Sequence, residues 1–121
     1  MRRFTALDLK TYLEECAQNQ SDGNSAPGDT CKEMPMLLDV REPWEYEKCH
    51  LNGSQLIPMR EIPYSLDKLD PDKETVVICH HGIRSRQVAY YLEQAGFDKV
   101  INLEGGVEAW AQDVDPDMQR Y

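Results

Sequence analysis

The sequence of 121 residues lacks a long apolar run, and it has few positive charges for its number of negative ones. No stretch approaches the roughly 18 apolar residues that a membrane-spanning helix needs. Acidic residues outnumber basic ones by 22 to 13, which gives a net charge of −9. Because nucleic acids and anionic membrane surfaces are bound through basic patches, the charge argues against both as partners.

No export signal is expected, although Arg2 and Arg3 resemble the arginine pair of a twin-arginine leader. Residues 5–10, which follow, are amphipathic and show neither an apolar core nor a cleavage site. We therefore expect a cytoplasmic protein. The reducing conditions of that compartment keep cysteines as free thiols.

Paired cysteine motifs are absent. No CxxC spacing occurs, so a closed zinc site is not expected. Cys16 shares a helical face with Leu9 and Leu13, which predicts a buried core residue. Cys31 lies in a polar stretch and is expected to be exposed, with no activating neighbour. The other two cysteines are Cys49 and Cys79.

Strands and helices alternate along the chain, whose length fits one compact domain. Buried strands are expected at residues 36–40, 56–58, 75–78 and 99–103. Helices are expected at 6–17, 43–47, 61–69 and 85–95, with a last short helix from the Gly105 and Gly106 pair through Trp110. Residues 18–35 are expected to form a long polar loop. The alternation predicts an α/β fold, with a central, mostly parallel β-sheet and helices on both faces.

The chemistry is expected where the strand at 75–78 meets the next helix. Cys79 ends that strand, and Ser85, six positions later, is expected to open the helix. Gly82 permits the positive φ of a tight curl, whose N–H groups form an anion site together with the helix N-terminus. Arg84 adds a cation. A cysteine in such surroundings ionises readily, so Cys79 is predicted to be a nucleophile rather than a filler of the core.

The same segment resembles the active-site loop of the rhodanese-like sulfurtransferases. The resembling loop residues are Cys79, His80, His81, Gly82, Ile83, Arg84 and Ser85. Three further segments resemble family signatures in the family's order: residues 37–41, 49–58 and 96–110. The resemblance implies a single rhodanese-like domain over residues 1–121, with its signatures between 36 and 110.

The resemblance also implies a mechanism. The thiolate of Cys79 would take the outer sulfur of a small anionic donor such as thiosulfate and pass it, from a persulfide, to a thiol or cyanide. A protein could supply the acceptor thiol. No metal or organic cofactor is implied. The donor is expected to be bound by the remaining loop residues: His80, His81, Gly82, Ile83, Arg84 and Ser85.

Several positions allow two interpretations. Cys49 stands where the family usually has glycine, as a tolerated substitution or as a second thiol that receives sulfur. Asp39 and Arg41 are expected to support the loop, by hydrogen bonds or by charge pairing, and His50 is expected to be structural. The sequence leaves open whether His80 or His81 faces the substrate.

Two other functions compete with sulfur transfer. Phosphatases and arsenate reductases of similar fold use Cys-x5-Arg, but Arg84 follows Cys79 by only five positions. The shorter loop is expected to be too tight for a tetrahedral phosphate. A rhodanese-like module that only docks to a partner, or carries sulfur to one, is the second alternative.

Overall fold

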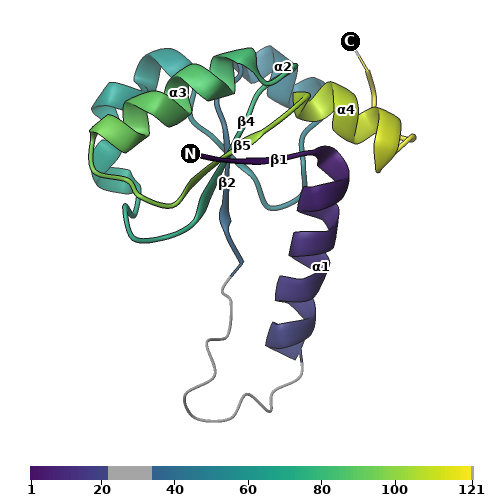
Figure 1. The fold of residues 1–121 in the computed structure, drawn as a ribbon. Helices are drawn as coiled ribbons and strands as arrows, with labels where there is room; N and C mark the ends of the chain where they lie inside the picture. Colours follow the sequence, from purple (N-terminus) through teal and green to yellow (C-terminus); the bar gives the residue numbers. More distant parts are fainter. Residues whose placement is uncertain (22–33, 121) are drawn as a thin grey trace.

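The computed structural model describes residues 1–21 and 34–120 as a parallel sheet covered by helices (Figure 1). The sheet has five strands in the order β1-β5-β4-β2-β3, and every neighbouring pair is parallel. The strands are β1 (Arg2–Phe4), β2 (Met36–Asp39), β3 (Gln55–Leu56), β4 (Thr75–Ile78) and β5 (Val100–Leu103). The predicted α/β class is confirmed.

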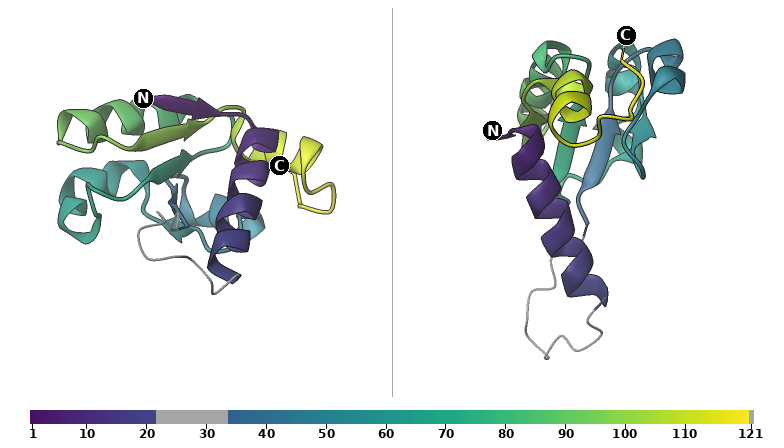
Figure 2. Two further views of the ribbon diagram at one scale, coloured as in Figure 1. Left: turned by 60° about the horizontal axis from the view of Figure 1, so that its bottom comes forward. Right: turned by 90° about the vertical axis from the view of Figure 1, so that its right-hand side faces the viewer.

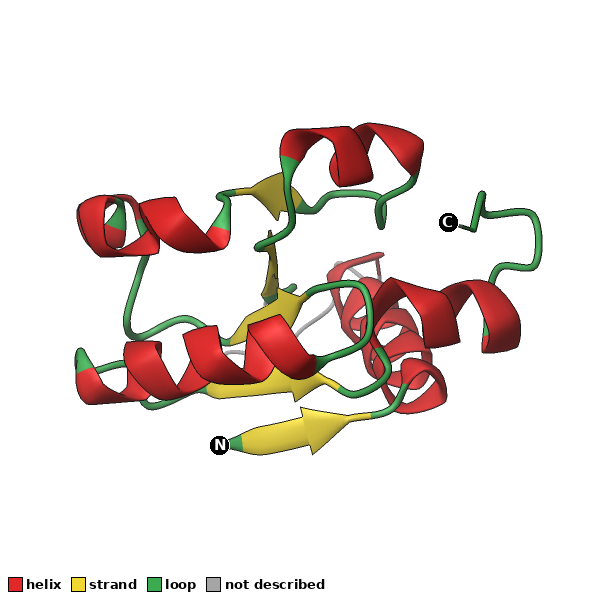
Figure 3. Ribbon diagram, turned by 90° about the horizontal axis from the view of Figure 1, so that it is seen from above, coloured by secondary structure: helices red, strands yellow, loops and turns green. Residues whose placement is uncertain are grey.

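Helices lie on both faces of this sheet (Figures 2 and 3). One face packs against α3 and two short 3₁₀ helices, and the other against α1 and α4. The helices are α1 (Ala6–Ser21), α2 (Pro43–Lys48), η1 (Met59–Tyr64), η2 (Leu66–Lys68), α3 (Ile83–Gln94) and α4 (Gly106–Asp113). Among the described residues, no helix has the length and apolar character needed to cross a membrane.

The strands divide their side chains between two cores. Val77 and Cys79 belong to the core under α3, and Val76 and Ile78 to the core under α1 and α4. This alternation follows from the two-residue period of a strand. Burial of each aliphatic side chain contributes about 1.5–3 kcal/mol, so a slip of one residue in register is strongly disfavoured.

The structure differs from the sequence-based expectation near the N-terminus. Residues 2–4 form β1, an edge strand that pairs with Ile101–Leu103 and was not predicted. Helix α1 continues to Ser21, past its predicted end at residue 17 and into the expected loop 18–35. Most of that loop, with Cys31, lies outside the described residues. Cys16 is buried, as predicted.

The helix predicted over residues 61–69 is wrong in type but right in its buried face. Two 3₁₀ turns replace one α-helix, and Pro63 lies inside the first. Proline lacks an N–H and disfavours helical geometry at the preceding residue, so an α-helix cannot run through it. Ile62 and Leu69 are nevertheless buried in the core under α3. Strand β4 has the predicted bounds, β2, β3 and β5 lie within two residues of theirs, and α4 extends to Asp113.

Candidate active site

Cys79 directly follows β4, at the edge of the sheet where the parallel strands end. Its residue surface is only 1% exposed. Helix α3 begins at Ile83 rather than at Ser85, so the connecting loop is shorter than predicted. Gly82 caps the helix with φ +96°, a left-handed conformation that turns the chain straight from loop to helix. Ile83, Arg84 and Ser85 therefore form the first turn of α3.

One hydrogen-bond donor and one acceptor lie beside the sulfur of Cys79. The N–H of Gly82 donates to Sγ at 2.9 Å, and the thiol of Cys79 lies 3.4 Å from the Ser85 hydroxyl oxygen, to which it donates. The sulfur thus sits at the N-terminus of a 12-residue helix. Both the N–H and the partial positive charge of the helix end favour a negative charge at this position.

Helix α4 begins against the same loop and holds it from the other side. The N–H of Val107 donates to the carbonyl of Cys79 at 2.9 Å, and the N–H of Glu108 donates to that of His80 at 3.1 Å. A Cβ at Gly106 would lie 2.2 Å from the Cys79 carbonyl oxygen. Only glycine allows so close an approach, which gives Gly106 a physical reason.

Arg84 forms a two-pronged ion pair with Glu45 of α2. Its two terminal nitrogens lie 2.8 and 2.9 Å from the two carboxylate oxygens. The side chain of Glu45 is 5% exposed and that of Arg84 is 37% exposed. Asp39, at the end of β2, binds Arg41. The cation that the sequence places beside the sulfur is therefore balanced by a buried carboxylate.

Asp39 and Arg41 form a second, fully buried ion pair at the end of β2. Arg41 Nε lies 2.9 Å from one Asp39 oxygen, and Nη2 lies 2.7 Å from the other. The guanidinium also donates to the carbonyls of Glu45 and Cys49, at 3.3 and 2.6 Å. The expected charge pairing of these two residues is present. It fixes α2, and with it the carboxylate that binds Arg84.

The two loop histidines have different surroundings. Their rings are 4.0 Å apart, but His81 is exposed, whereas His80 is partly buried with Nε2 at 3.7 Å from Glu108. Burial, and then the charge of His81, lower the pKa of His80 below its usual value. His50, in another segment, stacks on Tyr46, as a structural histidine would.

The predicted site residues are thus only partly brought together. Cys79, Gly82 and Ser85 converge at the sulfur, Arg84 faces Glu45, and Ile83 is 67% exposed on the surface. Cys49 is partly buried, with Sγ 3.9 Å from Arg41, and lines a small hollow that His80 also lines. In the described part of the chain, no group of histidine, cysteine and carboxylate side chains is arranged to hold a metal ion.

Sequence reasoning missed two residues of this site. Glu45 lies 39 positions before Arg84, a distance at which no pattern announces an ion pair. Asn102 of β5 accepts from the Ser85 hydroxyl at 2.5 Å and donates to the Gly82 carbonyl at 3.3 Å. A signal for Asn102 was present, because it is a polar residue within an apolar strand, and buried polar groups need partners.

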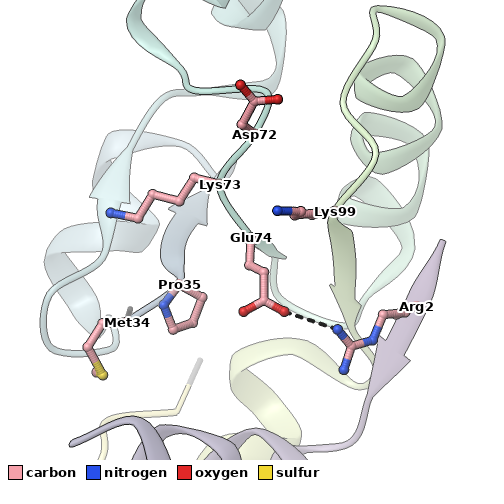
Figure 4. Close-up of a pocket in the computed structure, with 7 residues that line it drawn as sticks. All are labelled: Arg2, Met34, Pro35, Asp72, Lys73, Glu74 and Lys99. Atoms are coloured by element: carbon pink, nitrogen blue, oxygen red, sulfur yellow. Dashed lines mark hydrogen bonds and ion pairs between the residues drawn. The ribbon is translucent and has the colours of Figure 1, made fainter. Parts of the chain in front are cut away.

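A larger hollow, of about 450 Å³, lies at the opposite edge of the sheet (Figure 4). Both charge signs line it, and Arg2 there pairs with Glu74 at 3.1 Å. Its lining residues are Arg2, Met34, Pro35, Asp72, Lys73, Glu74 and Lys99. No predicted site residue belongs to it.

Comparisons with known proteins agree with the geometry of the fold. The family model described as the rhodanese-like domain matches residues 13–113. Over 89 residues the chain is 43% identical to the chloroplastic rhodanese-like/PpiC domain-containing protein 12 of Arabidopsis thaliana, a match that covers 70% of this chain and 30% of the relative. The chain therefore spans less than a third of that protein's length.

Two shorter proteins are similar over most of their length. A putative sulfurtransferase of Bacillus subtilis is 42% identical over 80 residues, which cover 66% of this chain and 77% of the relative. The crystal structure of a rhodanese-like domain protein from Staphylococcus aureus matches with a TM-score of 0.72 at 32% identity, covering 91% of both chains.

Proposed function

The chain belongs to the rhodanese-like family, and we propose that it is a sulfurtransferase whose chemistry runs through Cys79. The proposed substrates are a small anionic donor of sulfane sulfur, such as thiosulfate, and a thiol or cyanide as acceptor. One observation carries the proposal: Sγ of Cys79 accepts the N–H of Gly82 at 2.9 Å, at the N-terminus of α3. The N–H and the positive helix end stabilise negative charge at the position of the sulfur, which suits a nucleophile that bonds to an anionic donor.

The first half-reaction forms a persulfide. Cys79 loses its proton to solvent, and the thiolate attacks the outer sulfur of the donor. A bond forms between Sγ and that sulfur, the sulfur–sulfur bond of thiosulfate breaks, and sulfite leaves with the electron pair. The negative charge of the thiolate is then carried by the outer sulfur of the persulfide, and the difficult transfer has been divided into two steps.

The second half-reaction returns the enzyme to its starting state. An acceptor thiolate or cyanide attacks the outer sulfur, and the Cys79 thiolate leaves. Neither half-reaction needs a metal or an organic cofactor, because no electrons are gained or lost overall. The acceptor thiol can belong to a small molecule or to a protein.

The protein attracts an anion although its net charge is −9. Because Glu45 balances Arg84, the backbone N–H groups and the positive end of α3 supply much of the local attraction. We assign contact with the donor to His80, His81, Gly82, Ile83, Arg84 and Ser85. Within this set, the exposed His81 is better placed than His80 to meet an incoming donor.

The competing functions fit the site less well. Arg84 follows Cys79 by five positions instead of the six of the Cys-x5-Arg motif, and its guanidinium is paired with Glu45. A purely docking module has no need for a cysteine held in this way. Transfer to a protein acceptor is compatible with the proposal.

The experiment is to incubate the protein with thiosulfate and to map the modification by intact and peptide mass spectrometry. We expect one added sulfur atom on Cys79, removed by cyanide and absent in Cys79→Ser. Cys49→Gly is the matched control and should still be modified. Sulfur found on Cys31 or Cys49 but never on Cys79 contradicts the proposal.

Two broader assignments accompany this function. We treat residues 1–121 as one domain, which is supported by the pairing of β1 with β5. We place the activity in the cytoplasm, whose reducing conditions suit thiols outside disulfides, such as Cys49 and Cys79. Separation of β1 from the sheet without loss of stability would contradict the first assignment, and export of the protein in fractionated cells the second.

A further inference from the structure

Asn102 is fully buried on β5, and both polar atoms of its side chain are bonded to the active-site region. Nδ2 donates to the carbonyl of Gly82 at 3.3 Å, and Oδ1 accepts from the hydroxyl of Ser85 at 2.5 Å. The Gly82 carbonyl can only accept, so the amide nitrogen must face it. The amide oxygen is thereby directed at Ser85.

This orientation decides where the single proton of Ser85 points. The amide oxygen has no proton to give, so the hydroxyl must donate to it. The lone pairs of the hydroxyl oxygen then face Cys79, whose thiol donates across 3.4 Å. A chain of donors runs from Cys79 through Ser85 to Asn102, and it suits a sulfur that carries a proton.

Ionisation of Cys79 creates a competition for the Ser85 proton. A thiolate would accept from the hydroxyl, as it accepts from the Gly82 N–H. If the hydroxyl turned toward the sulfur, the amide oxygen of Asn102 would lose its donor at a position that is 0% exposed. A buried acceptor without a donor is costly, so Asn102 withholds the Ser85 proton from the thiolate.

We propose that Asn102 is a positioning residue for sulfur transfer, which acts by holding the Ser85 hydroxyl away from the Cys79 thiolate. The inference rests on the proposed role of Cys79. A thiolate with one hydrogen bond fewer is a stronger nucleophile. Once the inner sulfur is bonded to a second sulfur it is uncharged, and the hydroxyl can stay with Asn102. The contact therefore favours the persulfide over the free thiolate.

The test is the pH profile of Cys79 alkylation by iodoacetamide, followed at the Cys79 peptide by mass spectrometry. Asn102→Leu keeps the branching and the number of heavy atoms of the side chain but cannot accept the Ser85 proton. The hydroxyl is then free to donate to the thiolate, and the midpoint of the profile should move down by about one pH unit. In the Ser85→Ala background, Asn102→Leu should cause no such shift.

The proposal would be overturned if Asn102→Leu moved the alkylation midpoint to higher pH or left it in place. It would also be overturned if the variant caused the same downward shift in the Ser85→Ala background. Ser85→Ala alone decides the matter if Asn102→Leu does not fold. Its midpoint should stay in place or fall slightly, because Ser85 gives the thiolate little, whereas a rise of about one unit contradicts the proposal. Alkylation requires no sulfur transfer, so failure of the wild-type protein to take up sulfur would sink the proposed function and leave this test intact.

Discussion

The two edges of the sheet differ in what converges on them. Where the strands end, the N–H of Gly82 and the N-terminus of α3 lie at the sulfur of Cys79, within a small loop. Where the strands begin, a hollow of about 450 Å³ is lined by charges of both signs, and Glu74 there pairs with Arg2 (Figure 4). The hydroxyl of Tyr12 also donates to Glu74. The hollow is the larger space, but the helix N-termini that stabilise negative charge lie at the other edge. In a parallel sheet the helices begin where the strands end.

The largest effect is expected when the packing between α4 and the loop is broken. Gly106→Ala places a methyl group 2.2 Å from the Cys79 carbonyl oxygen, so the backbone must move. We expect a fall in kcat/KM of about a hundredfold or more, as for a lost anion-binding donor, with lowered stability in urea unfolding.

The matched control for Gly106→Ala is Gly96→Ala, at the end of α3 that lies near the beginning of β5. Gly96 has φ +101°, and a Cβ there meets nothing within 4 Å. It should lose about 1–3 kcal/mol of stability through backbone strain alone and keep its rate. Equal losses of rate in both variants would show that general destabilisation, and not the loop, sets the activity.

A smaller effect is expected from the ion pair of Arg84. In Arg84→Ala, kcat/KM for thiosulfate should fall by about tenfold to a few hundredfold, because a cation beside the donor is lost. The alkylation profile of Cys79 should move to higher pH, since a neighbouring cation favours the charged sulfur. Arg84→Lys should recover only part of the rate, since lysine lacks the planar fork that matches the carboxylate.

Two further variants separate this role from simple pairing with Glu45. If Arg84 serves only to neutralise the buried carboxylate, Glu45→Gln combined with Arg84→Ala should restore the rate. If Arg84 acts on the donor, the double variant should stay slow. Arg2→Ala breaks the ion pair at the opposite edge and should leave kcat/KM unchanged.

Titratable groups at the two edges should lower the stability of the protein at opposite ends of the pH range. The lowered pKa of His80 means that the unfolded chain binds the proton more readily, so stability should fall as the pH drops below about 6.5. Burial, and then the bond to Glu74, raise the pKa of Tyr12, so stability should fall as the pH rises above about 10.

Urea unfolding across the pH range checks this contrast. His80→Gln should remove part of the acid loss, and Tyr12→Phe should remove part of the alkaline loss. His50→Gln, whose ring stacks on Tyr46 in another segment, is the control. If the loss of stability at acid pH is unchanged in His80→Gln, it must come from groups other than His80.

Small effects are expected from the other thiols. The triple variant Cys16→Ala, Cys31→Ser, Cys49→Gly should keep most of the thiosulfate–cyanide activity, provided that it folds. Among the cysteines in the described residues, Cys79 is the one at a helix N-terminus with an N–H on its sulfur. Loss of turnover in folded Cys49→Gly alone would favour a relay between two thiols.

The smallest effect is expected at the hollow of Figure 4. Lys73→Ala with Lys99→Ala removes two cations from that edge. Strand β4 alone spans about 13 Å, more than the Debye length at physiological salt, so kcat/KM for thiosulfate should stay within about twofold. A tenfold fall in kcat/KM would mean that the cations at this edge influence the reaction at Cys79.

Local patterns predicted the part of the site that depends on neighbours in sequence. The β-branched run before Cys79, and the glycine three positions after it, were enough to predict a strand, a curl and a helix. The helix start was predicted two residues late, at Ser85, because Gly82 in its left-handed conformation caps a helix that begins at Ile83. The burial of Ile62 and Leu69 followed from spacing, although Pro63 changed the helix type.

Contacts between distant segments could not be predicted in this way. Which carboxylate pairs with Arg84 depends on how α2 packs, and the buried Arg41 determines that packing. The short charged strand β1 carries no apolar alternation, and it forms only because β5 offers an unpaired edge. Asn102 is polar within an otherwise apolar strand, and a buried side chain of that kind needs hydrogen-bond partners.

The position of β5 between β1 and β4 has a consequence for synthesis on the ribosome. A nascent chain that has just released Cys79 and its helix still lacks Asn102 and Gly106, and β1 has no strand to join. The residues of β1 must wait for those of β5, about a hundred positions later, a long loop closure that is slow to complete. The reactive sulfur is thus expected to gain its hydrogen-bonded surroundings late, when β5 enters the gap, so that a truncated chain would present only an ordinary thiol.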